Sequence, residues 1–131
     1  MRFFCVLLFA ISPAFALPAE FTTWIAGVNN YRIARVAVDS TGNTVVAGTR
    51  FLQNSSDIFV VKLDAAGKIV LFREVSGGGS DSAGDMAVDS AGNIYVAGST
   101  TSPYFPLNQA LETSPGPGFL FKMAADGSGF V

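Results

Sequence analysis

Two short acidic loops are the first places in this sequence where side chains could do chemistry. Asp39-Ser40-Thr41-Gly42-Asn43 returns fifty positions later as Asp89-Ser90-Ala91-Gly92-Asn93. Carboxylate and amide oxygens are the hard donors that Ca²⁺ prefers, but an EF-hand type of loop also needs alternating oxygen side chains and a distal bidentate glutamate. Neither loop has them. We therefore interpret both as hairpin turns, in which the aspartates accept bonds from backbone amides and the glycines take a positive φ.

A carboxylate site is the enzyme chemistry that the residue types leave open. The chain has no histidine and one cysteine, Cys5, which excludes Ser-His-Asp and Cys-His nucleophiles and the usual zinc sites within it. Glycosidase chemistry needs two acids several ångströms apart, and Asp81, Asp85 and Glu112 lie near predicted loops. We expect these acids to be solvated charges or turn partners, and we predict no catalytic residue, metal or cofactor.

Aromatic side chains offer a second kind of site, a surface on which a sugar ring could stack. Tyr104-Phe105-Pro106 lies in a stretch rich in Ser, Thr, Pro and Gly, and is the best candidate for an exposed recognition loop. Trp24 and Tyr95 fall in predicted strands, so we expect both in the core.

The elements that position these residues form a repeat. Residues 37–48 and 87–98 are identical at nine of twelve positions, and a second block, 59–67, is echoed at 119–127. A repeat of this period indicates a repeating architecture. The ten extra residues between the matched blocks of the second copy predict a surface loop, where added length costs little.

Each copy predicts short antiparallel strands joined by tight turns, in an all-β fold. Consecutive apolar positions, as in Thr44-Val45-Val46-Ala47, indicate sheets buried on both faces. We predict two units, at 33–80 and 81–131, the second truncated in its outer strand and the first preceded by an outer strand and connection at 17–32. In the first unit the predicted strands are 33–39, 43–49, 57–64 and 69–75.

The first sixteen residues have the pattern of a secretory signal peptide, expected as an apolar helix. Arg2 precedes an apolar run, and Ala14-Phe15-Ala16 is an A-x-A pattern that places cleavage between Ala16 and Leu17. The apolar run is far shorter than the roughly 20 residues that cross a bilayer. We therefore expect a secreted, periplasmic or cell-surface protein.

Charge narrows the expected partners. Ten acidic and eight basic residues, with no basic stripe, argue against nucleic acid. No second apolar stretch reaches membrane-spanning length, so no membrane contact is expected after cleavage. The expected partners are further units of the same kind, self-association through exposed sheet faces, or a polysaccharide or surface protein.

Several motifs occur in a fixed order along the chain. They are A-V-D-S-x-G-N-x-x-V-A-G in both copies, the glycine-rich Gly77–Asp81 between them, T-T-S-P-Y-F-P at Thr100–Pro106, F-x-x-K-[LM], and D-G-S at Asp126–Ser128. Their order resembles the bacterial seven-bladed β-propeller repeats called SBBP repeats. The resemblance implies blades of four antiparallel strands that radiate from an axis and pack face to face. It also implies that the Phe-Pro pair tucks into the blade.

The number of blades raises a question about the assembly. Closed propellers hold about four to eight blades, whereas this chain supplies fewer than two complete ones, with residues 21–25 matching the outer strand of a preceding blade. A lone pair of blades exposes two apolar faces. We expect a fragment of a longer product, and the alternatives are self-association or marginal folding.

Two functions remain open. The first is an exported non-catalytic repeat protein with a structural or interaction role, whose loops bind a polysaccharide or protein at the cell surface. The second is a fragment of an exported propeller enzyme, a lyase or glycoside hydrolase that acts on polysaccharide with loop carboxylates. The missing histidine and the few loop acids favour the first.

Overall fold

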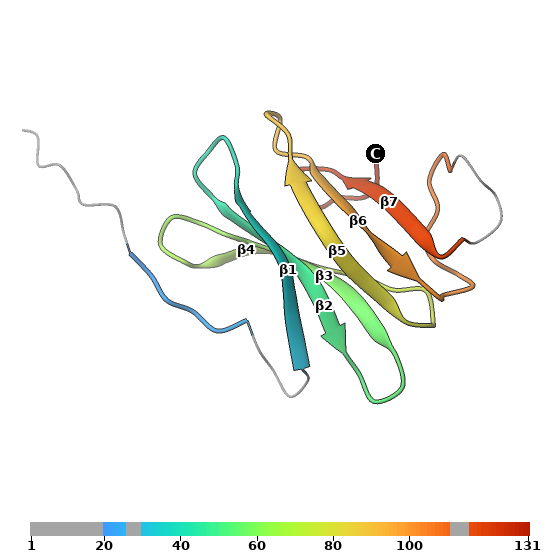
Figure 1. Cartoon of the computed structure of the whole chain (residues 1–131). Coiled ribbons are helices and arrows are strands. Elements are labelled where there is room, and N and C mark those ends of the chain that lie inside the picture. The colour runs from blue at the N-terminus through green and yellow to red at the C-terminus, as the bar shows by residue number, and fades with distance from the viewer. Residues whose placement is uncertain (1–19, 26–29, 111–115) are drawn as a thin grey trace, which may run out of the picture.

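The computed structural model describes residues 20–25, 30–110 and 116–131, which form an all-β structure (Figure 1). No helix occurs in these ranges, and the predicted signal helix and its cleavage site at Ala16 and Leu17 lie outside them. The strands are β1 (Asn30–Val38), β2 (Thr44–Phe51), β3 (Ser56–Leu63), β4 (Ile69–Val75), β5 (Asp81–Val88), β6 (Ile94–Thr100) and β7 (Gly118–Met123).

The strands form two antiparallel sheets. Sheet A holds β1 to β4 in chain order, and sheet B holds β5, β6 and β7. Irregularities interrupt the first strand of each sheet at matching places, between Ile33 and Arg35 and between Ala83 and Asp85. The antiparallel all-β prediction is confirmed, and the sequence repeat is also a repeat of backbone geometry.

The two sheets pack face to face on the larger apolar cluster. Successive side chains of a strand point to opposite faces, so Val45 lies between the sheets and Val46 lies on the outer face of sheet A. Consecutive apolar residues in β2 and β3 thus belong alternately to two clusters, one on each face of sheet A. The cluster between the sheets includes Val45, Ala47, Ile58, Val60, Ile94, Val96, Phe121 and Met123. The outer cluster consists of Val46, Phe59, Val61 and Leu63.

Strands β1 and β5 lie beside each other, and equivalent residues of the two repeats bond across the gap. Three pairs of residues that are 50 positions apart are hydrogen-bonded, two through both side chains and one from the Ser40 hydroxyl to the Ser90 carbonyl oxygen. Contacts between equivalent positions arise when one sheet is related to the next by rotation about a nearby axis. The pairs are Arg32–Ser82, Arg35–Asp85 and Ser40–Ser90.

Two basic side chains of sheet A also bind the turn that follows β7. Lys62 Nζ donates to the carbonyl oxygen of Ala125 at 2.9 Å, and Arg73 Nε donates to that of Gly127 at 2.8 Å. A buried amine needs such partners, because an unpaired charge in the interior is costly. These bonds hold the tip of sheet B against sheet A.

Residues 20–25, which we call the strap, form no β-strand, in contrast to the expected outer strand at 21–25. A strand needs a hydrogen-bonded neighbour, and no described strand pairs with the strap. The strap instead lies on the outer face of sheet A. Its Phe21 meets Gly67 in the β3–β4 turn, and its Ile25 packs against the outer cluster.

Candidate functional site

Asp39 organises the turn between β1 and β2. Its Oδ1 accepts the backbone amides of Thr41 and Asn43 at 3.0 and 2.9 Å, and its Oδ2 accepts Asn43 Nδ2 at 2.9 Å. Gly42 closes the turn with a φ of +85°, a conformation that costs little only for glycine. Burial acts to raise the pKa of Asp39, but the hydrogen bonds from Asn43 and Thr41 outweigh it and hold that pKa well below its usual range.

Asp89 repeats this arrangement between β5 and β6. Its Oδ1 accepts the amides of Ala91 and Asn93 at 3.0 and 2.8 Å, and its Oδ2 accepts Asn93 Nδ2 at 2.9 Å. Gly92 has a φ of +83°. The hydrogen bond from the Asn93 side chain lowers the pKa of Asp89. Both loops therefore show the bonding of an aspartate-capped turn.

The positive charge beside each of these aspartates is a lysine. Lys62 Nζ lies 3.3 Å from Asp39 Oδ2, where both side chains are buried. Lys122 Nζ lies 3.9 Å from Asp89 Oδ2, and this pair is about one-third exposed. Among the described residues, no group of three or more His, Cys, Asp or Glu side chains is placed to hold a metal ion.

The structure puts Asp81 and Asp85 to different uses. Asp81 is fully buried at the start of β5, where its carboxylate accepts the hydroxyls of Thr100 and Ser102 and the amide of Gly77. Asp85 is exposed and accepts two bonds from the Arg35 guanidinium at 2.6 and 3.0 Å, which lower its pKa. Glu112 lies outside the described residues.

Asp81 connects two of the sequence motifs, its own glycine-rich stretch and the T-T-S stretch. Its partners are the Gly77 amide, in the connection after β4, and the hydroxyls of Thr100 and Ser102, where β6 ends. Ser102 Oγ also accepts the amide of Gly79 at 2.8 Å. Sequence reasoning missed this cluster, although the Thr-x-Ser spacing was visible, because nothing local shows which acid the hydroxyls meet.

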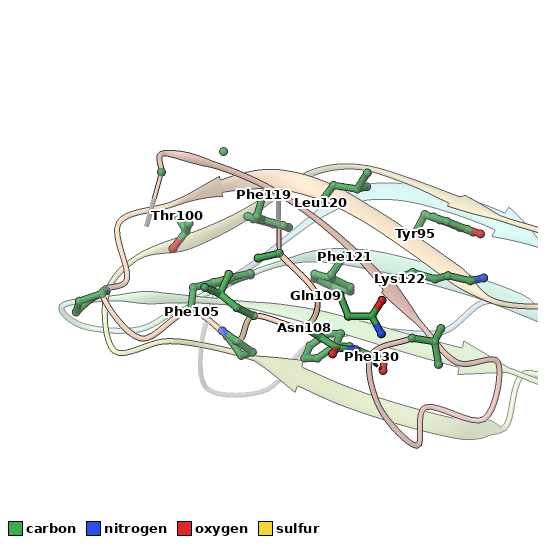
Figure 2. A pocket seen from close by; sticks show the side chains of 17 residues that line it. Tyr95, Thr100, Phe105, Asn108, Gln109, Phe119, Leu120, Phe121, Lys122 and Phe130 are labelled. Atoms are coloured by element: carbon green, nitrogen blue, oxygen red, sulfur yellow. Dashed lines mark hydrogen bonds between the residues drawn. The ribbon is translucent and has the colours of Figure 1, made fainter. Parts of the chain in front are cut away.

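An aromatic groove lies along the free side of β7 (Figure 2). Its volume is about 570 Å³. Phe105 stacks on Phe119 with ring centres 4.6 Å apart, and Phe119 stacks on Phe121 at 5.7 Å. Phe130 meets Phe121 edge to face at 5.1 Å. Such pairs add stabilisation beyond the area they bury, and they give the groove a rigid apolar wall.

The loop after β6 separates the three residues expected to form a recognition surface. Phe105 is buried in the aromatic stack, Pro106 is half-buried, and Tyr104 is 84% exposed. Asn108 ties the loop down by donating to the carbonyl oxygen of Phe130 at 3.1 Å. Tyr104 is thus the member of the three that remains available to a ligand.

The expectation that Trp24 and Tyr95 lie in the core is wrong for Trp24. The Trp24 side chain is 91% exposed, because the strap lies on sheet A with Ile25 turned toward the outer cluster. Tyr95 is half-buried on the outer face of sheet B. Lys122 Nζ lies 5.3 Å from the centre of its ring, a cation–π distance.

Comparison with known families agrees with this geometry. The family model of the SBBP beta-propeller repeat matches residues 72–105, which confirms the resemblance over this stretch. The matched residues run from β4 to Phe105 and include the whole Asp81 cluster. A search of curated proteins finds no match. In the part of the chain that the structure describes, no helix is long and apolar enough to cross a membrane.

Proposed function

We propose that this chain is an exported, non-catalytic β-propeller repeat protein with a structural or interaction role at the cell surface or outside the cell. The observation that carries the proposal is the bonding of equivalent residues 50 positions apart, between β1 and β5 and between the turns that follow them. Such contacts suit four-stranded blades that are rotated about a shared axis. The family match at residues 72–105 supports the same architecture.

The uses of the acidic residues support a non-catalytic role over the propeller-enzyme alternative. A glycosidase needs two acids that face one substrate across several ångströms. Asp81 is buried beneath the T-T-S stretch, and Asp85 is held by Arg35 between the sheets. The groups that bind each carboxylate are therefore part of the fold.

The exposed Tyr104 loop is the proposed contact for a polysaccharide or a surface protein. Tyrosine gives a sugar or protein a large rigid surface with a polar tip, and Tyr104 is 84% exposed beside a loop that Asn108 and the Phe105 stack hold in place. The signal-peptide pattern of residues 1–16 supports export to where such ligands occur.

Co-sedimentation with bacterial surface polysaccharides tests this role. The purified chain should bind, and Tyr104→Ala should weaken binding by about tenfold, while Val70→Ala, a change at an exposed position on β4, should not. Equal binding by Tyr104→Ala would remove the loop from the proposal. Shortening of the polysaccharide that is abolished by Asp85→Asn would establish the enzyme alternative instead. N-terminal sequencing of the exported protein should begin at Leu17.

A further inference from the structure

The strap occupies, on sheet A, the place that β4 occupies on sheet B. Leu71 of β4 packs on Gly127, so that a Cβ added there would clash with the leucine side chain. Phe21, fifty positions before Leu71, packs in the same way on Gly67, where an added Cβ would lie 2.8 Å from the phenylalanine ring. Ile25 packs on the outer cluster, as its counterpart Val75 packs in the cluster between the sheets.

Strand β7 is an edge strand of sheet B, and part of its free side is unpaired in the described part of the chain. Met123 is bridged to Phe130, and the Val131 amide donates to the Lys122 carbonyl oxygen at 3.0 Å. Within the described residues, the remainder of this edge pairs with no strand. An exposed strand edge is a template for pairing with another segment.

The register of β4 on β3 shows where the strap would fall on β7. Glu74 of β4 stands opposite Phe59 of β3. The matching positions in the repeat are Trp24 in the strap and Phe119 in β7. Because Val131 already bonds Lys122, residues 22–25 of the strap are the ones that can pair with β7 in this register. They bring Trp24 opposite Phe119, in the aromatic groove.

Charge favours one way of placing a second copy against sheet B. Arg35 of β1 faces Asp85 of β5, so sheet A carries the cation of this pair and sheet B carries the anion. A second copy that sets its sheet A on the outer face of sheet B would bring its own Arg35 toward the other side of Asp85. A two-fold contact of sheet B with sheet B would bring two Asp85 carboxylates together, which is unfavourable.

The surroundings of Lys122 also favour a second copy whose sheet A lies on the outer face of sheet B. Lys62, its counterpart on sheet A, pairs with Asp39 and reaches the Ala125 carbonyl oxygen in the turn of the next sheet. Lys122 pairs with Asp89 on sheet B. The position that corresponds to Ala125 is Ala65 in the β3–β4 turn, and a second copy in the head-to-tail arrangement would present it there.

We infer that copies of this chain associate head to tail, with the strap of one copy pairing with β7 of the preceding copy and Trp24 filling its aromatic groove. The outer face of sheet B then covers the outer face of sheet A, where Ile33, Val36 and Val38 are about half exposed or more. This contact is heterologous, so it forms a ring if the rotation closes. The inference rests on the proposed repeat architecture and names one partner for it.

Sedimentation velocity and tryptophan fluorescence test the inference together, because Trp24 is the single tryptophan of the chain. Dilution of the purified chain should lower its mass from a multiple of the protomer toward one copy. Over the same concentrations, the emission maximum of Trp24 should move to longer wavelength as the indole leaves the groove.

Two variants locate the contact. Leu120→Glu places a charge on the outer face of sheet B, where Leu120 is 71% exposed, and Trp24→Ala removes the groove's occupant. Each should raise the dissociation constant at least tenfold without altering the far-UV circular dichroism of the protomer. Tyr104→Glu, at an exposed position in the loop after β6, is the control and should leave association unchanged.

Three results would overturn the inference. They are a monomer at every concentration, association that Leu120→Glu and Trp24→Ala leave unchanged, and an oligomer in which the Trp24 emission stays that of an exposed indole. None of them would affect polysaccharide binding through Tyr104, so failure of this inference is distinguishable from failure of the proposed ligand role.

Discussion

The guanidinium of Arg35 on β1 binds both carboxylate oxygens of Asp85 on β5, at 2.6 and 3.0 Å. The two residues occupy the same position in successive repeats, 50 residues apart, and both flank the irregularity of their strand. One repeat thus carries a cation where the next carries an anion. The pair aligns two strands that share no backbone ladder.

Reversal of this pair should be tolerated better than loss of it. Arg35→Asp alone places two acids together and should lower the urea midpoint, whereas Arg35→Asp with Asp85→Arg should restore most of it. Because both side chains are more than half exposed, added salt should shrink the differences between these variants. Urea unfolding followed by circular dichroism at low and high salt measures this. A midpoint that does not recover in the double variant would show that the position, and not the charge pairing, matters.

Asp39→Asn should destabilise the fold at neutral pH by roughly 2 kcal/mol, because it leaves Lys62 buried without its anion. The folded pKa of Asp39 lies below its unfolded value near 4. Its contribution is therefore present above pH 4 and declines as the pH falls below it. The difference between the variant and the parent, measured by urea unfolding from pH 7 to pH 3, should shrink toward the acid end.

Asp89→Asn is the matched change in the second turn. Asp89 makes the same turn bonds, but its lysine partner is more distant and partly exposed. At pH 7, Asp89→Asn should lower the free energy of unfolding by less than Asp39→Asn does. Equal losses would mean that the turn bonds, and not the buried Lys62, cause the Asp39 effect.

Asp81→Asn should cost about 3 kcal/mol of unfolding free energy, because an amide nitrogen would face donors that a carboxylate oxygen now accepts. Those donors are the Ser102 hydroxyl and the Gly77 amide. Glu20→Gln, at an exposed strap residue, should have no measurable effect. Urea unfolding at pH 7 compares the two variants. An unchanged unfolding free energy for Asp81→Asn would show that the cluster does not depend on a charged acceptor.

Gly48→Ala should cost roughly 3 kcal/mol or more, because an added methyl overpacks the interior of sheet A. Its Cβ would run into the carbonyl oxygen of Arg32 and would lie 2.7 Å from the Phe59 ring. At Gly129, no heavy atom lies within 4 Å of an added Cβ, so Gly129→Ala should be neutral. Thermal unfolding of the two alanine variants makes the comparison, and equal melting temperatures would contradict it.

The same close approach explains the last letter of the repeated motif. In sheet B, a Cβ on Gly98 would meet the carbonyl oxygen of Ser82 and the Phe119 ring, as at Gly48. Both copies end in V-A-G because the third strand places a phenylalanine ring where a side chain would stand. The repeat showed that this glycine recurs, and the packing shows why.

Strand order and turn chemistry could be predicted from the sequence because they depend on neighbours along the chain. The hydrogen bonds of the Asp39 and Asp89 turns lie within five residues. Consecutive apolar residues such as Val45 and Val46 indicate a strand that is buried on both faces. The predicted outer strand at 69–75 matches β4 for the same reason. Local spacing carries this information directly.

The candidate site could not be predicted in this way, because it depends on which surfaces meet in the folded chain. Asp81 looks like a loop acid in sequence, and it is buried because β5 passes under the T-T-S stretch twenty residues away. Trp24 looks like a core residue, and it is exposed because the strap has no strand beside it. The Arg35–Asp85 pair and the aromatic groove likewise join distant segments. Sequence spacing reports the period of the repeat, whereas the rotation between the sheets decides which of its residues touch.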